Sequence, residues 1–118
     1  MDYEFYVNQY HGQAIDEGQW PALSSRAEEQ LARYKRDYRV TGTEEQERYA
    51  VCALAELMGY YADARNGQGG LRYASVGSVS VSGKGIYSQV DISPEGEERE
   101  LYRCARRYLR IERGWGEC

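Results

Sequence analysis

The stretch Tyr49-Ala50-Val51-Cys52-Ala53-Leu54-Ala55-Glu56-Leu57-Met58-Gly59-Tyr60-Tyr61 begins with the longest uninterrupted apolar run of the chain, residues 49–55. As a helix it would be apolar around most of its circumference, which is typical of a helix in the middle of a bundle. We therefore predict a central helix over Glu44–Arg65. Polar or small residues form a narrow stripe along it, namely Glu45, Arg48, Cys52, Glu56, Gly59 and Asp63.

Signals for a start and an end flank this helix. Thr43 followed three residues later by Gln46 matches a capping box, in which each side chain satisfies the backbone amide of the other residue. Asn66-Gly67, followed by Gly69-Gly70, provides residues that readily adopt the left-handed conformation of a helix C-cap.

Two amphipathic helices are predicted to flank the central one. In the first, Asp16–Tyr38, apolar residues recur every three or four positions, and Pro21 is tolerable only in the first turn. The second, Pro94–Arg110, begins with Ser93 as N-cap and proline at its first position. A short helix is predicted within Met1–Tyr10. The residues expected to be buried together are Leu31, Leu54, Leu57, Met58, Leu101 and Ala105.

The segment between the last two long helices has a different pattern. Residues 76–82 and 86–92 alternate between apolar and polar side chains and are joined by Gly83-Lys84-Gly85. Alternation on both sides of a short glycine-flanked turn predicts a β-hairpin. The fold class is therefore mostly α: a small bundle of three main helices and a short N-terminal helix, with a β-hairpin arm at about residues 72–92. Residues 111–118 are predicted to be a flexible tail.

Composition restricts the function classes. The 118 residues fit a single domain, and the net charge of −4 gives no reason to expect a nucleic-acid-binding surface. No apolar run approaches the roughly 20 residues of a membrane span, and the start of the chain lacks a signal-peptide pattern. We therefore expect a cytoplasmic product. Three widely spaced cysteines and one histidine favour no metal site and no cofactor.

Tyrosine is the unusual residue, with 12 copies against one phenylalanine. Its large apolar body and polar tip suit surfaces that are buried in one state and wet in another, such as subunit interfaces. The rings would equally well line the edges of a small core. The composition leaves both interpretations open.

The catalytic alternatives lack essential parts. A Cys–His pair would have to use His11, which is more simply a solvated loop residue. The glycines of residues 67–70 follow a helix rather than a strand, and no GK[ST] accompanies them, so they do not predict a phosphate-binding loop. Glutamates cluster in first turns of predicted helices, where capping and solubility explain them. We expect no enzymatic activity.

The order of these features resembles the small head–tail connector, or adaptor, proteins of long-tailed phages and prophages of Gram-positive bacteria. The stretches that carry the resemblance are Tyr3-Glu4-Phe5-Tyr6, Tyr10-His11-Gly12, Trp20-Pro21-Ala22-Leu23, residues 49–61, Ser75-Val76-Gly77-Ser78-Val79-Ser80-Val81-Ser82 and residues 98–109. The match covers nearly the whole chain. His11 departs from it, because a small residue is expected there.

The resemblance implies a homo-oligomeric ring below the portal of the virion, in contact with the portal protein and a downstream connector or tail protein. DNA would only pass through the ring, without sequence-specific binding, and no catalytic residue is implied. Before assembly the protein would be in the host bacterial cytoplasm. As hypotheses, the subunit interface comprises Val76, Val79, Val81, Ile86, Val90 and Ile92, and the portal contact comprises Ile111 and Trp115. The alternatives are a cytosolic helical regulatory or protein-interaction module and, more distantly, a small metal-free hydrolase.

Overall fold

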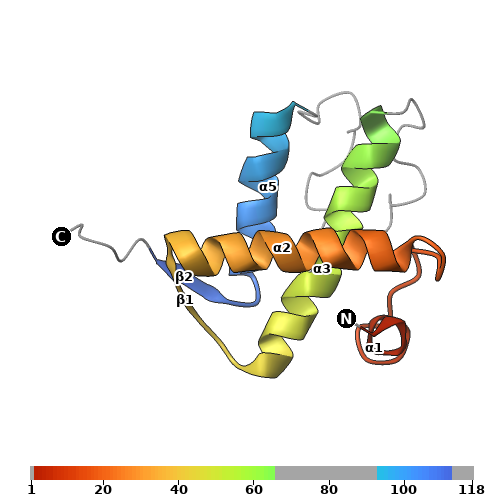
Figure 1. Cartoon of the computed structure of the whole chain (residues 1–118), viewed down its shortest axis with the longest axis horizontal. Coiled ribbons are helices and arrows are strands. Elements are labelled where there is room, and N and C mark those ends of the chain that lie inside the picture. The colour runs from red at the N-terminus through yellow and green to blue at the C-terminus, as the bar shows by residue number, and fades with distance from the viewer. Residues whose placement is uncertain (1, 66–92, 113–118) are drawn as a thin grey trace.

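A computed structural model describes residues 2–65 and 93–112, and Figure 1 shows the arrangement of its elements. In these residues the chain is mostly helical, with one small antiparallel sheet, so the predicted class of a small helical bundle is confirmed. The elements in chain order are α1 (Tyr3–Asn8), α2 (Trp20–Asp37), β1 (Arg39–Thr41), α3 (Glu44–Arg65), α5 (Pro94–Arg106) and β2 (Arg110–Glu112).

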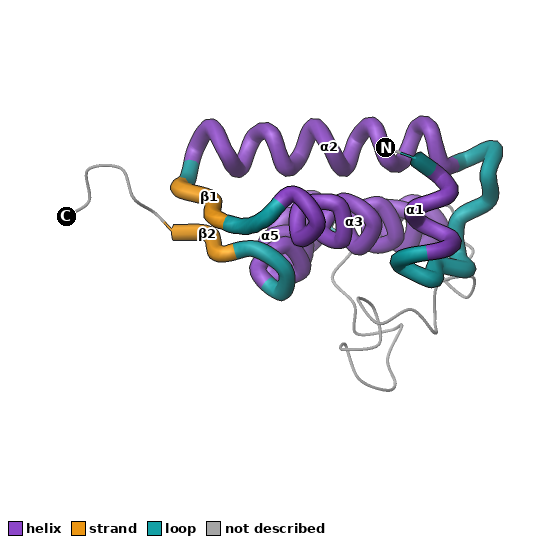
Figure 2. Tube along the Cα trace, turned by 90° about the horizontal axis from the view of Figure 1, so that it is seen from below, coloured by secondary structure: helices purple, strands orange, loops and turns teal. Residues whose placement is uncertain are grey.

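The helix α3 is central, as predicted. α2 lies across α3, and α5 packs beside α3 (Figures 1 and 2). Of the six residues expected to be buried together, Met58 alone is only partly buried, at the edge of the core. The five buried residues are Leu31, Leu54, Leu57, Leu101 and Ala105. The predicted position of the core is therefore confirmed.

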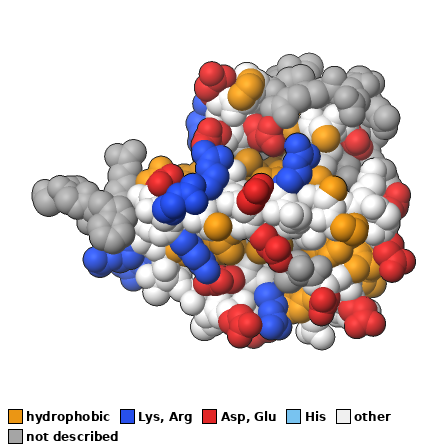
Figure 3. Space-filling model, in the orientation of Figure 1, with side chains coloured by type: hydrophobic (Ala, Val, Ile, Leu, Met, Phe, Trp, Pro, Cys, Tyr) orange, Lys and Arg blue, Asp and Glu red, His pale blue; other side chains and the backbone are white. Residues whose placement is uncertain are grey.

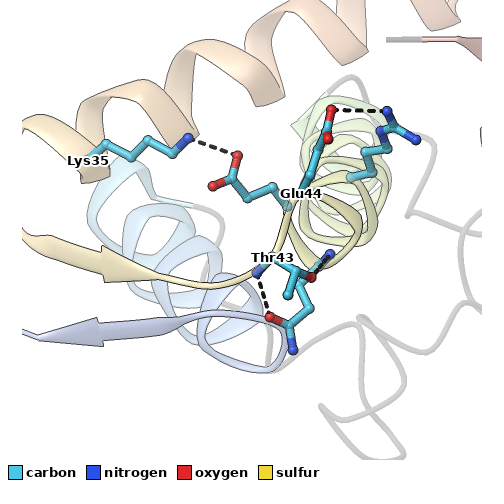
Figure 4. Close-up of polar contacts among 6 residues, drawn as sticks. Lys35, Thr43 and Glu44 are labelled. Carbon is cyan, nitrogen blue, oxygen red and sulfur yellow. Dashed lines mark hydrogen bonds and ion pairs between the residues drawn. The ribbon is translucent and has the colours of Figure 1, made fainter.

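Local capping fixes where α3 and α5 begin. The Thr43 hydroxyl accepts a hydrogen bond from the Gln46 backbone amide at 3.1 Å, and the Thr43 amide donates to the Gln46 side chain at 2.8 Å (Figure 4). The predicted capping box is thus present, and α3 has the predicted bounds. At the start of α5, the Ser93 hydroxyl accepts from the Gly96 amide at 3.1 Å, as expected of an N-cap.

Replacing Thr43 with Ala should lower the free energy of unfolding by about 0.5–2 kcal/mol, because the Gln46 amide loses its acceptor at the helix start. Urea denaturation measures the change. Thr43→Ser retains the hydroxyl and serves as the matched control. A Thr43→Ala protein as stable as Thr43→Ser would show that the capping box contributes nothing.

The start of α2 differs from the prediction. Asp16 to Gln19 form a turn in which the Asp16 carbonyl accepts from the Gln19 and Trp20 amides, each at 3.0 Å, and the helix itself begins at Trp20. Pro21 therefore does lie in the first turn, where its missing amide hydrogen leaves no bond unmade. The inward face predicted for this helix is confirmed by the burial of Trp20, Leu23, Ala27, Leu31 and Tyr34.

The C-terminal boundary was predicted incorrectly. The helix α5 ends at Arg106 rather than Arg110, and Arg110–Glu112 form β2, which pairs with β1 in the register Val40–Ile111. Ile111 is only 4% exposed, so the flexible tail does not begin there. The partner strand lies about 70 positions earlier in the chain, and a pairing so distant leaves no periodic pattern in the local sequence. The predicted hairpin arm at residues 72–92 and residues 113–118 lie outside the described residues.

Candidate functional site

The middle of the polar stripe on α3 is buried. Glu56 is 2% exposed and Cys52, one turn earlier, is fully buried, whereas Glu45 and Arg48 near the start of the helix are exposed. A carboxyl group inside a core needs hydrogen-bond partners, because an unpaired polar group there is strongly destabilising. The partners of Glu56 come from the N-terminal segment, which we define as residues 2–19.

Tyr6 is the centre of this contact. Its ring is fully buried, and its hydroxyl donates to Glu56 Oε2 at 2.8 Å. The phenolic oxygen of Tyr6 also accepts hydrogen bonds from the backbone amides of Ala14 and Ile15, at 3.0 and 3.1 Å. One phenol thereby joins α1, the loop that follows it and the central helix.

Tyr10 provides the second contact with the carboxyl group. Its hydroxyl lies 3.2 Å from Glu56 Oε1, and it also shares a hydrogen bond with Tyr108, in the turn after α5. The bonds from Glu56 through Tyr10 to Tyr108 connect α3, the N-terminal segment and the end of α5. Tyr108 is half-buried, so this chain of bonds runs from the core to the edge of the protein.

Aromatic packing surrounds the polar centre. The Tyr6 ring stacks on Trp20 with 4.6 Å between ring centroids and an interplanar angle of 24°. Tyr3 approaches Trp20 edge-on at 5.9 Å and donates its hydroxyl to the Ile15 carbonyl at 2.9 Å. All ten tyrosines among the described residues are buried or half-buried, so they fill the core and its edges in this subunit.

The loop after α1 is shaped to follow the Tyr6 ring. A Cβ atom at Gly12 would lie 2.1 Å from two carbons of that ring, so no other residue fits there without displacing Tyr6. The preceding residue, His11, is exposed and has a left-handed φ of 63°, a conformation that glycine adopts at the least cost. A histidine at this position is therefore sterically tolerated, because its side chain is exposed, and its only restriction is the left-handed backbone conformation.

Burial dominates the acid–base properties of the cluster. It raises the pKa of Glu56 above the ordinary 4.5, an effect that the hydrogen bonds from Tyr6 and Tyr10 partly oppose. Burial also raises the pKa of both phenols and brings the pKa of the Cys52 and Cys104 thiols to about 12. Neutral, buried thiols are poor nucleophiles. The cluster of Glu56, Tyr6 and Tyr10 can hold one proton on Glu56. Because Glu56 is buried, a substrate cannot reach its carboxyl group in this structure.

A groove of about 350 Å³ is a second candidate site. It lies between α2 and α5, with Met58 and Ala62 of α3 among its lining residues. Arg33 of α2 and Glu98 of α5 approach to 3.9 Å across it, and both side chains are more than half exposed. Figure 3 shows Lys and Arg side chains interspersed with Asp and Glu on the face that α2 forms. This face of the protein is therefore not a basic patch.

Two further observations concern ions and membranes. Within residues 2–65 and 93–112, no group of three or more His, Cys, Asp and Glu side chains is arranged to hold a metal ion. No helix in the same ranges is both long enough and apolar enough to cross a membrane.

The predicted site residues have different outcomes. Ile111, expected to contact the portal, packs instead in the core as part of β2, which corrects that prediction. Trp115 and the six predicted interface residues, Val76, Val79, Val81, Ile86, Val90 and Ile92, lie outside the described residues.

The Glu56–tyrosine cluster was missed by the sequence analysis. The available signal was Glu56 itself, the only charged residue between Tyr49 and Tyr61 in a helix predicted to be central. The identity of its partners was not available, because Tyr6 and Tyr10 lie 50 and 46 positions away in the chain.

Comparison of the chain with protein-family models, with curated proteins and with solved structures gave no significant match. The fold and the buried centre define it as a small helical protein whose N-terminal segment packs on a three-helix core and directs two tyrosine hydroxyls at one buried carboxyl group.

Proposed function

We propose that this protein is a structural component of a phage or prophage particle, a head–tail connector that assembles into a ring below the portal and has no enzymatic activity. The order of its sequence motifs, from the aromatic N-terminal segment to the last arginine-rich helix, carries the proposal. In the virion its partners would be further copies of itself, the portal protein and a downstream connector or tail protein.

The connection between α3 and α5 supports an assembly role. These helices pack against each other, and helices so placed are usually joined by about 2–8 residues, whereas 28 residues, 66–93, lie between them here. Connections this long are commonly functional. Five β-branched residues at alternating positions, Val79, Val81, Ile86, Val90 and Ile92, favour strand pairing with another subunit as that function.

We expect the purified protein, alone or with its portal protein, to form rings visible by negative-stain microscopy. Replacing both Val79 and Val81 with Asp should abolish the rings, because two charges would be buried in the subunit contact, and should leave the helical circular dichroism unchanged. Ala22→Asp combined with Ser25→Asp adds the same charge at exposed positions of α2 and is the matched control.

Two outcomes would contradict the proposal. Wild-type protein that forms no rings even with portal protein present would refute the connector role. Loss of helical signal in the Val79→Asp/Val81→Asp variant would show that these residues belong to the core of the subunit rather than to a contact between subunits.

The second candidate function is a cytosolic helical module that binds a partner protein, and the groove between α2 and α5 favours it. Its walls carry Arg26 and Arg33 opposite Glu97 and Glu98, a pattern that suits a partner with both charges. A protein that stays monomeric with portal protein, and loses partner binding when Arg26 and Arg33 are replaced with Glu, would support this alternative.

A further inference from the structure

The hydrogen-bond directions at Tyr6 can be assigned from the geometry. A phenolic oxygen has one hydrogen and two lone pairs. At Tyr6 the Ala14 and Ile15 amides occupy both lone pairs, so the phenolic hydrogen must point to Glu56 Oε2, 2.8 Å away. Oε2 is therefore an acceptor, and a proton placed on Oε1 has the Tyr10 hydroxyl as its hydrogen-bond partner.

Oε1 faces Tyr10, which permits two arrangements of hydrogen atoms. When Glu56 is neutral, Oε1 donates to the Tyr10 hydroxyl at 3.2 Å, and Tyr10 donates in turn to Tyr108. When Glu56 is ionised, Tyr10 donates to Oε1 and Tyr108 donates to Tyr10. The same groups stay paired in both arrangements. The difference between them is a negative charge inside the core, which burial disfavours.

The other titratable side chains around Glu56 do not change their protonation state between mildly acidic and alkaline pH. The N-terminal segment contributes Tyr6 and Tyr10, α3 contributes Cys52, and the α5 side contributes Cys104 and Tyr108, all with a pKa raised by burial and therefore neutral. Arg107 acts on Cys104 and Tyr108, and its charge opposes the rise of their pKa. α2 contributes Trp20, which does not titrate. Among these side chains, Glu56 is thus the one that changes its charge between mildly acidic and alkaline pH.

We propose that a proton on Glu56 fastens the N-terminal segment to the helical core, and that ionisation of Glu56 releases this segment locally while α2, α3 and α5 remain folded. The proposal does not depend on the connector role. Release is expected to be local because α1 has six residues, too few to be stable alone, whereas α3 also packs against α2 and α5. It would uncover Glu56 and Trp20, so that the closed and released states differ in the surface they offer to a partner.

The direction of the pH effect follows from the raised pKa of Glu56 in the folded protein. A group of this kind stabilises the closed state fully below its ordinary pKa of 4.5, and the stabilisation is lost as the pH rises through the folded-state value. Between these two values a single proton changes the equilibrium between closed and released states by up to about tenfold per pH unit, and above the folded-state value the equilibrium no longer changes with pH.

Hydrogen exchange at the Ala14 and Ile15 amides reports directly on release of the N-terminal segment, because these amides donate to the Tyr6 hydroxyl. After correction for the intrinsic exchange rate, their protection factors should fall by up to about tenfold per pH unit between pH 4.5 and the folded-state pKa of Glu56, and level off above it. The Leu54 amide, in the middle of α3, should keep its protection over the same pH range.

The Glu56→Gln variant should abolish this pH dependence. Glutamine has the same shape, is neutral at every pH, and can accept from Tyr6 while donating to Tyr10, as the protonated carboxyl group does. The Ala14 and Ile15 amides should therefore be as well protected in the variant at alkaline pH as in the wild type at acidic pH. Glu45→Gln removes an exposed carboxyl from the same helix and should behave as the wild type.

Four results would overturn the proposal. They are pH-independent protection of Ala14 and Ile15 in the wild type, an unchanged pH dependence in Glu56→Gln, a Glu56→Gln protein that does not fold, and a parallel loss of protection at Leu54. The last would mean that ionisation of Glu56 unfolds the whole protein rather than releasing the N-terminal segment.

Discussion

Replacing Leu57 with Ala should lower the free energy of unfolding by about 2–5 kcal/mol. Leu57 is 3% exposed in the middle of α3, the helix that packs against both α2 and α5. Truncation removes buried apolar area and leaves a cavity that several packed side chains cannot all move to fill. Chemical denaturation followed by circular dichroism measures the loss.

Two matched substitutions show whether burial is the cause of that loss. Met58→Ala, at the next position of the same helix, should be less destabilising because Met58 is only partly buried. Val7→Ala, at a residue 38% exposed, should change the stability by no more than about 0.5 kcal/mol. A Leu57→Ala loss below about 1 kcal/mol would contradict the central position of α3.

Replacing Tyr6 with Phe should have the second largest effect, a loss of about 2–4 kcal/mol, although it removes a single oxygen atom. The ring and its stacking on Trp20 remain, but Glu56 Oε2 and the amides of Ala14 and Ile15 lose their partner. Each buried polar group left unpaired is destabilising by about 1–3 kcal/mol, and the three groups share one site, so the losses do not simply add. Thermal or urea unfolding at acidic pH, where Glu56 is neutral, gives the cleanest measurement.

Tyr10→Phe is the matched control for this substitution. It also removes a phenolic oxygen bound to Glu56, but the bond is longer, at 3.2 Å, and the residue is half-buried. Its loss should stay below that of Tyr6→Phe, because Tyr10→Phe leaves no backbone amide without its acceptor. Equal effects of the two substitutions would show that the hydroxyl of Tyr6 is not the hub of the N-terminal segment.

The sequence by itself determined the helices and their inward faces. The bounds of α3 were predictable because the capping box between Thr43 and Gln46 operates over three residues, and a local signal survives in a local pattern. Ser93 and Pro94 marked the start of α5 for the same reason. The apolar pattern of the helices also identified five buried core residues, because a helix buries the side chains of its apolar face whatever its partners. They are Leu31, Leu54, Leu57, Leu101 and Ala105.

Only the tertiary structure decided how distant segments use their polar groups. The pairing of β1 with β2 places Ile111 in the core. A helix was predicted up to Arg110 because the local arginine-rich sequence does not indicate that the following residues pair with Val40. Likewise, Glu56 could be recognised as a charge in an apolar helix, but its hydrogen-bond partners lie more than 40 positions away. Side-chain periodicity is set by the geometry of one element, whereas the protonation and pairing of a buried carboxyl group are set by whatever other elements the fold brings against it.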